Sequence, residues 1–407
     1  MKIKIAEATT VAITQIIKLF SLIFIVKILT TVLDEHTFGL YILSMTVITL
    51  YNQVYFGGYA VSFGRHSINK KITNISQKLI KISIIYLVFN IFVAIPLSQA
   101  FKIIDFDLSI ILCIASLFAG FLNIFQNIAN SMRARFVVLN AVILEYILKI
   151  PPVLIINNYY AKSQLELKII LIIWMVSSMV VAFFYYIYLL KIKIEEYEVS
   201  ESELNSFARP YQKWGLFTWG LQNSDRWSLG LLANIASVGI YGALYQVFYS
   251  PILLVSGMLT TYISPYVYKR KDAGLLRTKD YGPLRIIMIL NSMFGFILCL
   301  VLFLYGEIII GLILPKGYQD YSYLAALLVA AATVSAICNY ISVKLAAEKK
   351  VESQMKQKIL SSLFGIPLVF TGAYLFDLYG VVLSLMSISI INVIWMSYLV
   401  GGGSEKI

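Results

Sequence analysis

Residues 207–251, FARPYQKWGLFTWGLQNSDRWSLGLLANIASVGIYGALYQVFYSP, decide how this chain folds. The stretch joins two apolar helices, and the adjacent Asp225 and Arg226 lie about 12 residues beyond Trp214 in the first of them. At ~1.5 Å per residue this depth is roughly 18 Å, near the middle of a hydrocarbon core about 30 Å thick. Charges at that depth face a protein interior or a wet cavity and indicate a functional site. The structural alternative is an Asp–Arg pair that bridges two helices.

The composition sets the class of the protein. Hydrophobic residues make up 59% of the 407 residues and charged residues 13%, whereas a soluble domain carries about 25% charged residues. Apolar runs of about 18 residues or more recur along the chain, which predicts an all-α polytopic membrane protein. Three cysteines lie inside apolar runs, and the two histidines, His36 and His66, show no ligand spacing. We therefore expect no metal site and no disulfide.

Hydropathy divides the chain into about twelve transmembrane helices. We expect spans at 11–33, 38–64, 79–98, 108–131, 136–157, 167–190, 214–234, 239–268, 284–305, 319–347, 358–376 and 379–400. They predict a six-helix N-terminal lobe at 1–190, a glutamate-rich cytoplasmic linker at 191–213 and a six-helix C-terminal lobe at 214–400. The tail at 401–407 contains GGGS, which resembles an engineered linker, and it is excluded from the fold.

The basic residues predict the orientation. Most Lys and Arg residues fall in the loops on one side of the membrane, and the other side holds only Lys102, Lys162, Lys168 and Lys316. By the positive-inside rule both termini face the cytoplasm. The net charge of +12 comes mostly from these Lys and Arg residues of the cytoplasmic loops. It gives no reason to expect a nucleic-acid partner, because the basic residues are spread over every cytoplasmic loop.

The two halves resemble each other. Phe38-Gly39-Leu40-Tyr41 recurs as Val238-Gly239-Ile240-Tyr241, and Ile150-Pro151-Pro152-Val153 recurs as Ile366-Pro367-Leu368-Val369. The offsets are 200 and 216 residues. Six helices per half is an even number, so both halves have the same orientation. This pattern predicts a parallel repeat about an axis along the membrane normal, with the substrate site between the halves near the midplane.

Buried charge marks the candidate site. Lys18, Lys149 and Arg226 supply cations inside the spans, and Glu145 and Asp225 supply anions. Glu145 and Lys149 are spaced i, i+4 and can pair on one face, whereas adjacent Asp225 and Arg226 point about 100° apart and are not expected to neutralise each other. A wet cavity that receives an anionic head group lowers the cost of burying these charges. Phosphate suits Arg through bidentate contacts and Lys as a point charge. The alternative is that the charges serve only as structural partners.

Two polar stripes are candidate sugar contacts. They are Asn123, Asn127 and Asn130 in one helix, and Tyr241, Tyr245 and Tyr249 in another. Amides and phenols can hydrogen-bond sugar hydroxyls, and Tyr rings can pack on sugar faces. The alternative is structural, because amides also hold transmembrane helices together.

The stretch 209–247 resembles a known family through Asn223-Ser224-Asp225-Arg226-Trp227, Val238-Gly239-Ile240-Tyr241 and Tyr245-Gln246-Val247. It is similar to the Wzx-type flippases of O-antigen or capsule repeat units, in the multidrug/oligosaccharidyl-lipid/polysaccharide exporter superfamily. The resemblance implies two six-helix lobes around a V-shaped central cavity. It also implies alternating access that moves an undecaprenyl-diphosphate-linked oligosaccharide from the cytoplasmic to the periplasmic leaflet of the bacterial inner membrane. Cationic cavity residues would bind the diphosphate, and Lys18, Lys149 and Arg226 qualify by depth.

The resemblance also sets the expected partners. They are the lipid-linked oligosaccharide, membrane lipids, and polysaccharide polymerase or assembly proteins, with no cofactor and no enzymatic activity. Glu145 and Asp225 leave protons and sodium open as coupling ions. One alternative is another exporter of the superfamily, such as a cation-coupled drug exporter. An integral membrane polymerase or ligase is disfavoured, because the predicted outer loops are short and carry few basic residues.

Overall fold

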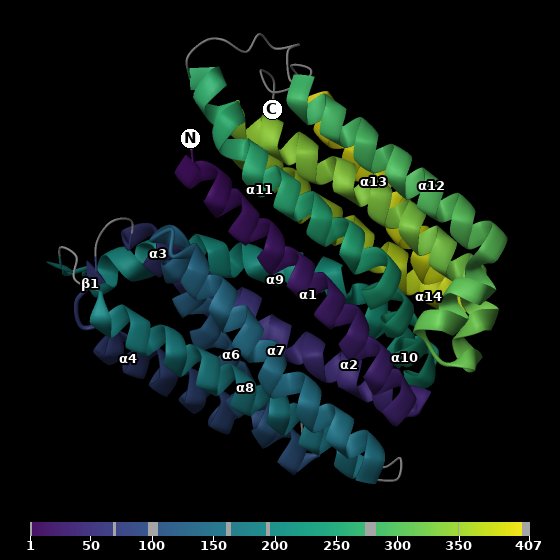
Figure 1. The fold of residues 1–407 in the computed structure, drawn as a ribbon, viewed down its shortest axis with the longest axis horizontal. Coiled ribbons are helices and arrows are strands. Elements are labelled where there is room, and N and C mark those ends of the chain that lie inside the picture. Colours follow the sequence, from purple (N-terminus) through teal and green to yellow (C-terminus); the bar gives the residue numbers. More distant parts are fainter. Residues whose placement is uncertain are drawn as a thin grey trace. The chain divides into compact units, whose positions relative to one another are not determined.

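The computed structural model describes residues 2–67, 71–96, 105–159, 164–192, 196–272, 282–348 and 350–400, and helices dominate these ranges (Figure 1). The elements are α1 (Lys2–Val32), α2 (Glu35–Leu50), η1 (Tyr51–Phe56), α3 (Gly57–His66), β1 (Lys71–Ile72), α4 (Ile75–Phe89), η2 (Asn90–Ala94), α6 (Phe106–Ser131), α7 (Arg135–Tyr159), α8 (Gln164–Lys191), β2 (Glu196–Tyr197), α9 (Glu201–Leu232), α10 (Ile235–Leu244), η3 (Tyr245–Tyr249), α11 (Ser250–Asp272), α12 (Gly282–Ile313), η4 (Lys316–Tyr321), α13 (Ser322–Ala347) and α14 (Val351–Val400). The two short strands pair in parallel. The prediction of an all-α membrane protein is confirmed.

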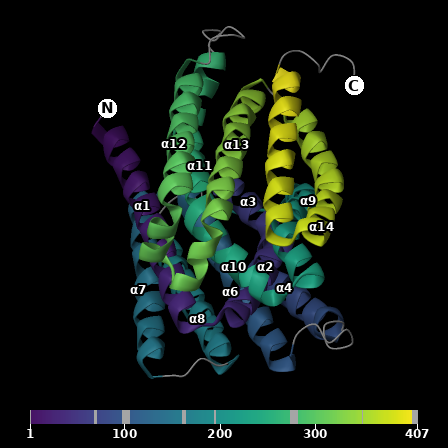
Figure 2. The same cartoon turned by 90° about the vertical axis from the view of Figure 1, so that its right-hand side faces the viewer.

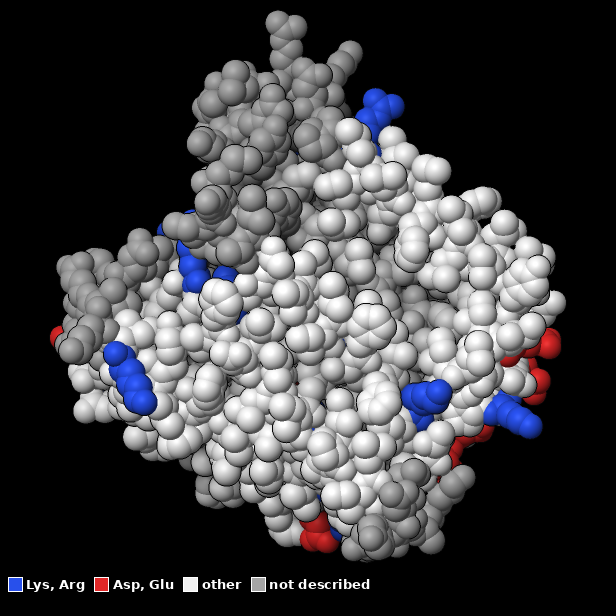
Figure 3. Space-filling model, in the orientation of Figure 1, with Lys and Arg blue, Asp and Glu red and all other residues white. Residues whose placement is uncertain are grey.

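Nine helices in the described ranges are long and apolar enough to cross a membrane. One of them, α14, is two helices joined at Phe376 and Asp377, where φ of Asp377 is 49°. The helical segment α2–η1–α3 and the helix α9 fall outside these nine because they are more polar. Counting both of them, and α14 as two, gives the twelve helical segments that hydropathy predicted. Figure 3 shows that few charged side chains interrupt the surface of one face, as a multi-pass membrane protein requires.

The chain forms two compact units, each built from two separate stretches. The first unit holds Met1–Ile17 and Leu40–Trp219, and the second holds Lys18–Gly39 and Gly220–Ile407. Helices α1, α2 and α9 therefore pass from one unit into the other. The lobes predicted at 1–190 and 214–400 follow the sequence repeat, and that division stays a prediction.

Helix α9 begins inside the predicted linker. Ser200 and Glu203 form a reciprocal capping box: the Ser200 N–H donates to Glu203 Oε2 at 3.1 Å, and the Glu203 N–H donates to Ser200 Oγ at 3.2 Å. These bonds satisfy N–H groups that a helix start would otherwise leave without partners. The Ser200 N–H and hydroxyl both donate to Glu203 Oε2, and these two bonds lower the pKa of the exposed Glu203 carboxyl. A helix therefore starts at Glu201, where hydropathy alone indicated a loop.

Two of the three π turns in the described ranges end two positions before a proline, Pro96 or Pro251. The N–H of the intervening residue, Ile95 or Ser250, donates to the carbonyl oxygen five residues earlier. Proline has no N–H, and its ring clashes with the carbonyl four residues back in a regular helix. The wider turn relieves this conflict without ending the helix. Both prolines thus locate a π turn, and the one before Pro251 contains Tyr245 and Tyr249.

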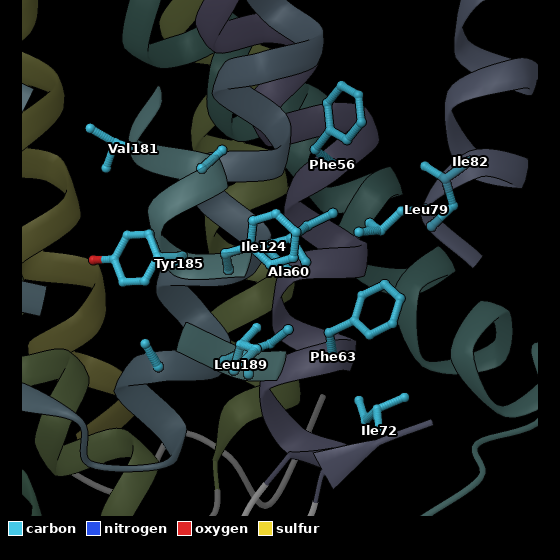
Figure 4. Packing of buried hydrophobic residues seen from close by; sticks show 14 of the residues in the cluster. Phe56, Ala60, Phe63, Ile72, Leu79, Ile82, Ile124, Val181, Tyr185 and Leu189 are labelled. Carbon is cyan, nitrogen blue, oxygen red and sulfur yellow. The ribbon is translucent and has the colours of Figure 1, made fainter. Parts of the chain in front are cut away.

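The first unit is built around α6, which packs against α3, η1 and α8. Its core includes Phe56, Phe63 and Ile124, which are fully buried, together with Val181 and Tyr185 from α8 (Figure 4). In the second unit α13 packs against α11, α12 and α14 (Figure 2). Each unit therefore has its own packed interior.

The predicted repeat has a structural counterpart inside the second unit. A Cβ atom added to Gly39 would lie 2.0 Å from the carbonyl oxygen of Ile235, and one added to Gly239 would lie 2.1 Å from the carbonyl oxygen of Glu35. Adding the sequence offset of 200 turns Glu35 into position 235 and Gly39 into position 239. The offset therefore converts each of these two contacts into the other. Contacts exchanged in this way are the property of a contact on a two-fold axis. Only glycine allows the starts of α2 and α10 to approach this closely.

Candidate functional site

Asp225 and Arg226 lie on the part of α9 that belongs to the second unit. The Asp225 side chain is 1% exposed and that of Arg226 is 12% exposed, and Arg226 Nη1 lies 3.7 Å from Asp225 Oδ1. The backbone N–H of Arg226 donates to the same carboxylate oxygen at 2.8 Å. The expectation that these neighbours do not pair was therefore wrong. The short Asp225 side chain bends back onto the next N–H, which brings the carboxylate towards the guanidinium.

Tyr241 holds the other carboxylate oxygen of Asp225. Its fully buried hydroxyl donates to Asp225 Oδ2 at 2.6 Å. Hydrogen bonds to an ionised group are among the stronger ones in proteins. Since Tyr241 belongs to α10, this bond joins α9 to α10 and fixes the carboxylate beside Arg226.

The Arg226 guanidinium rests on a ring and a helix turn. Its Cζ atom lies 4.3 Å from the centroid of the Tyr245 ring. Its Nη1 atom donates to the Gln222 carbonyl oxygen at 3.2 Å and to Asn223 Oδ1 at 3.1 Å. A cation over an aromatic face is attracted by the ring quadrupole. The guanidinium is thus held in place mainly by neutral groups, with one carboxylate at the edge of ion-pair range.

Arg226 keeps donors for a ligand. A guanidinium has five N–H donors, and the two bonds to α9 use Nη1 alone. The Arg226 side chain is 12% exposed, so part of it is accessible beside the contacts that position it. That is an arrangement that an anion site needs.

The tyrosine stripe continues from this site into the second unit. The Tyr241 and Tyr245 rings are 5.7 Å apart, and Tyr245 stacks on Tyr249 at 4.4 Å. The Tyr249 and Ser335 hydroxyls lie 3.0 Å apart, and Ser335 lies 2.6 Å from Ser389 Oγ. Tyr241 and Tyr249 therefore have protein partners for their hydroxyls, while Tyr245 supports Arg226. The prediction that this stripe contacts sugar stays a prediction.

Glu145 and Lys149 lie in the first unit. Lys149 Nζ forms an ion pair with Glu145, and it lies 5.2 Å from the centroid of the Trp174 ring. Tyr41 packs edge-on against Trp174 at 5.9 Å. The i, i+4 pairing on α7 is the arrangement expected from the spacing. Lys149 and Arg226 belong to different units, so their membership in one cationic layer stays a prediction.

The remaining site residues are part-buried. Lys18 lies on α1, in the stretch that belongs to the second unit. Asn127 Nδ2 donates to the Asn123 carbonyl oxygen and to Asn123 Oδ1, both at 2.9 Å. Asn130 Oδ1 accepts a hydrogen bond from Arg135 at 2.7 Å. The asparagine stripe thus divides into a pair within α6 and one residue that fixes the turn into α7.

Sequence reasoning missed two partners of the buried cations. Asn223 stands three residues before Arg226, so the i, i+3 spacing could have identified it. Trp174 lies in an apolar run of α8 and carried no such signal. In the described ranges there is no group of three or more His, Cys, Asp or Glu residues placed to hold a metal ion.

No protein-family model and no curated protein sequence matches this chain. Solved structures of other proteins do match its fold. An inward-facing multidrug resistance MATE family transporter of the MOP superfamily matches with a TM-score of 0.65 and 12% identity, over 97% of this chain and 98% of that one. The lipid II flippase MurJ in an inward closed conformation matches with a TM-score of 0.72 and 16% identity, over 98% of this chain and 87% of that one. An outward-facing MATE transporter gives a TM-score of 0.62 and 13% identity, over 98% and 97%. The chain thus has the fold of MOP-superfamily transporters.

Proposed function

We propose that this chain is a flippase that moves an undecaprenyl-diphosphate-linked oligosaccharide from the cytoplasmic to the periplasmic leaflet of the bacterial inner membrane. The substrate would be a repeat unit of O-antigen, capsule or a related surface polysaccharide. The observation that carries the proposal is the Arg226 guanidinium, held by Tyr245 and Asn223 on a side chain that is 12% exposed. The fold shared with a lipid II flippase and the family resemblance at 209–247 support it.

Arg226 suits a diphosphate because its planar fork makes two parallel hydrogen bonds to phosphate oxygens. The distance of 3.7 Å to Asp225 is too long for a hydrogen bond. A diphosphate can therefore compete with Asp225 for the Arg226 guanidinium while the guanidinium stays on the Tyr245 ring. Lys18 and Lys149 would add point charges along the path, and Lys18 would act at entry.

Energy coupling would use a buried carboxylate. Asp225 is next to Arg226, and Glu145 is paired with Lys149. Binding of a proton or a sodium ion at either one would change how firmly its cation is held. Alternating access would carry the head group across. Both termini would face the cytoplasm, and polymerase or assembly proteins would take up the product.

A cation-coupled drug exporter is the second candidate. A buried acid, Asp225, beside the rings of Tyr241 and Tyr245 favours it, because aromatic rings and a carboxylate also suit organic cations. The two functions differ in the sign of the substrate charge. Arg226 is needed for an anionic substrate and opposes a cationic one.

Translocation by purified protein in liposomes tests the proposal. Arg226→Ala should abolish flipping of a lipid-linked oligosaccharide, Arg226→Lys should keep part of it, and Lys18→Ala should weaken it less than Arg226→Ala. Lys168→Ala is the matched control, because Lys168 lies in the first unit and forms an exposed salt bridge with Asp107 at 3.0 Å. Wild-type rates for Arg226→Ala would reject the diphosphate role. Export of organic cations with no lipid flipping would favour the second candidate.

A further inference from the structure

A recessed pocket of about 370 Å³ lies in the first unit among α4, α6 and α8. Its lining is almost entirely apolar and includes the rings of Phe118, Phe121, Phe125, Phe183 and Tyr186. Leu79, Phe125 and Ala182 form a buried floor, while Ile80, Ile84 and Phe183 are exposed at the rim. The pocket contains none of the charged residues of the candidate site. Its volume falls in the range of roughly 300–1,000 Å³ that is typical of ligand pockets.

The pocket lies near one end of the helices that form it. On α4 it is lined by residues between 76 and 84, and α4 begins at Ile75; on α8 its last residue is Tyr186, and α8 ends at Lys191. At ~1.5 Å per residue it covers roughly 12 Å of depth. Lys78 and Lys81 stand at this end, bonded to the Val199 carbonyl oxygen and to Glu201. The pocket thus runs from the basic end of these helices into the hydrocarbon region.

The chemistry of the lining selects a hydrocarbon. One of its few polar groups, the Ser83 hydroxyl, already donates to the Leu79 carbonyl oxygen at 2.7 Å. The rings meet at open angles: Phe118 and Phe121 lie edge-on at 6.4 Å, and Phe125 and Tyr186 are tilted at 5.9 Å. A lining of rings and aliphatic side chains accepts a hydrocarbon chain and offers almost nothing to a polar ligand.

We propose that this pocket binds a segment of the polyprenyl chain of the lipid-linked substrate. The inference rests on the proposed function, because that function requires a long isoprenoid chain beside the protein while the head group crosses. Lys78, whose ammonium is bonded to a neutral carbonyl oxygen while Lys81 is paired with Glu201, would attract the anionic diphosphate end of such a lipid, and the apolar floor matches its chain. Holding the chain at the lipid-facing surface of the first unit would leave the head group free to enter the protein.

Photocrosslinking tests the pocket directly. A benzophenone amino acid replaces Phe183, which is 61% exposed in the pocket, or Phe294, which is 60% exposed on α12 and outside it. The protein is placed in phospholipid liposomes with polyprenyl diphosphate that carries no sugar, and the adducts are identified by mass. We expect the ratio of prenyl to phospholipid adducts to be roughly tenfold higher at 183 than at 294. Equal ratios at the two positions, or adducts at 183 that are mainly phospholipid, would overturn the proposal.

A second variant controls for reactivity of the probe. Ala182→Leu adds volume at the buried floor, so it should lower the prenyl adduct at 183 and leave the adducts at 294 unchanged; an unchanged prenyl adduct at 183 in a monodisperse protein would count against the pocket. Because the probe lipid carries no sugar, the result is independent of transport. Prenyl adducts without flipping would remove the proposed function and keep the pocket. Flipping with equal adduct ratios would keep the function and remove the pocket.

Discussion

The crossing of α2 and α10 gives a sharp prediction about stability. In Gly239→Ala the new Cβ atom would lie 2.1 Å from the Glu35 carbonyl oxygen, whereas ordinary van der Waals contact begins at 3.4 Å. The helices would have to separate by about 1.3 Å, the difference between these two distances. The obstacle is a backbone atom, so no side-chain rotation can relieve it. Overpacking of this kind costs about 1–3 kcal/mol.

A matched control separates this cost from helix propensity. Replacing a helical glycine by alanine normally stabilises by about 0.5–1 kcal/mol. Gly257 on α11 has no atom within 4 Å of its added Cβ atom, so Gly257→Ala should show that gain. Gly39→Ala should behave like Gly239→Ala. Because both widen the same crossing, the double variant should cost less than the sum of the two single variants.

The assay is the temperature at which half of the purified protein stays monodisperse in detergent. We expect this temperature to be higher than wild type for Gly257→Ala and lower than wild type for both Gly39→Ala and Gly239→Ala. If Gly239→Ala is as stable as Gly257→Ala, the close crossing is absent. If the losses of thermal stability add in the double variant, the two glycines act at independent sites and do not share one crossing.

Three further predictions concern the charges. Lys149→Met should destabilise the protein more than the double Glu145→Gln, Lys149→Met variant, because the single change leaves a part-buried carboxylate without its partner; thermal stability in detergent decides this. The lowered pKa of Glu203 stabilises the start of α9 above the unfolded pKa of about 4.3. The protection factor of that first turn in hydrogen exchange should therefore fall as the pH falls through the lower folded value, and Glu203→Gln should remove the dependence. Cysteine at position 316 should react with an impermeant maleimide in intact cells and cysteine at 271 only after permeabilisation; early reaction at 271 would reverse the orientation.

The sequence predicted the helical segments because hydropathy over about 20 residues is a strong signal. It missed the start of α9, although Ser200 and Glu203 carried a capping-box signature that hydropathy does not register. The π turns before Pro96 and Pro251 were not predictable from proline alone, because Pro210 and Pro367 lie inside helices assigned as α. The short offset match at Gly39 and Gly239 pointed to a real contact.

The site was harder to predict, because side-chain directions depend on local geometry. The Cα–Cβ bonds of Asp225 and Arg226 point about 100° apart around the helix. The Asp225 carboxylate nevertheless turns back towards Arg226, because it accepts a hydrogen bond from the Arg226 backbone N–H. The place of Tyr245 under Arg226 depends on how α10 and η3 pack against α9. The sequence contains no measure of that packing. It therefore identified Tyr245 as polar and aromatic without showing which group it supports.

Transport by the double variant Asp225→Asn, Arg226→Gln distinguishes a diphosphate-binding Arg226 from a purely structural Asp–Arg pair. The change removes both charges and keeps both side chains polar, so a purely structural pair would be replaced by two neutral amides without an unpaired charge. If Arg226 binds the lipid diphosphate, the double variant should insert and fold but fail to flip a lipid-linked oligosaccharide in liposomes, as Arg226→Gln alone should. Recovery of the wild-type flipping rate by the double variant would show that Arg226 serves only Asp225, and it would contradict the account.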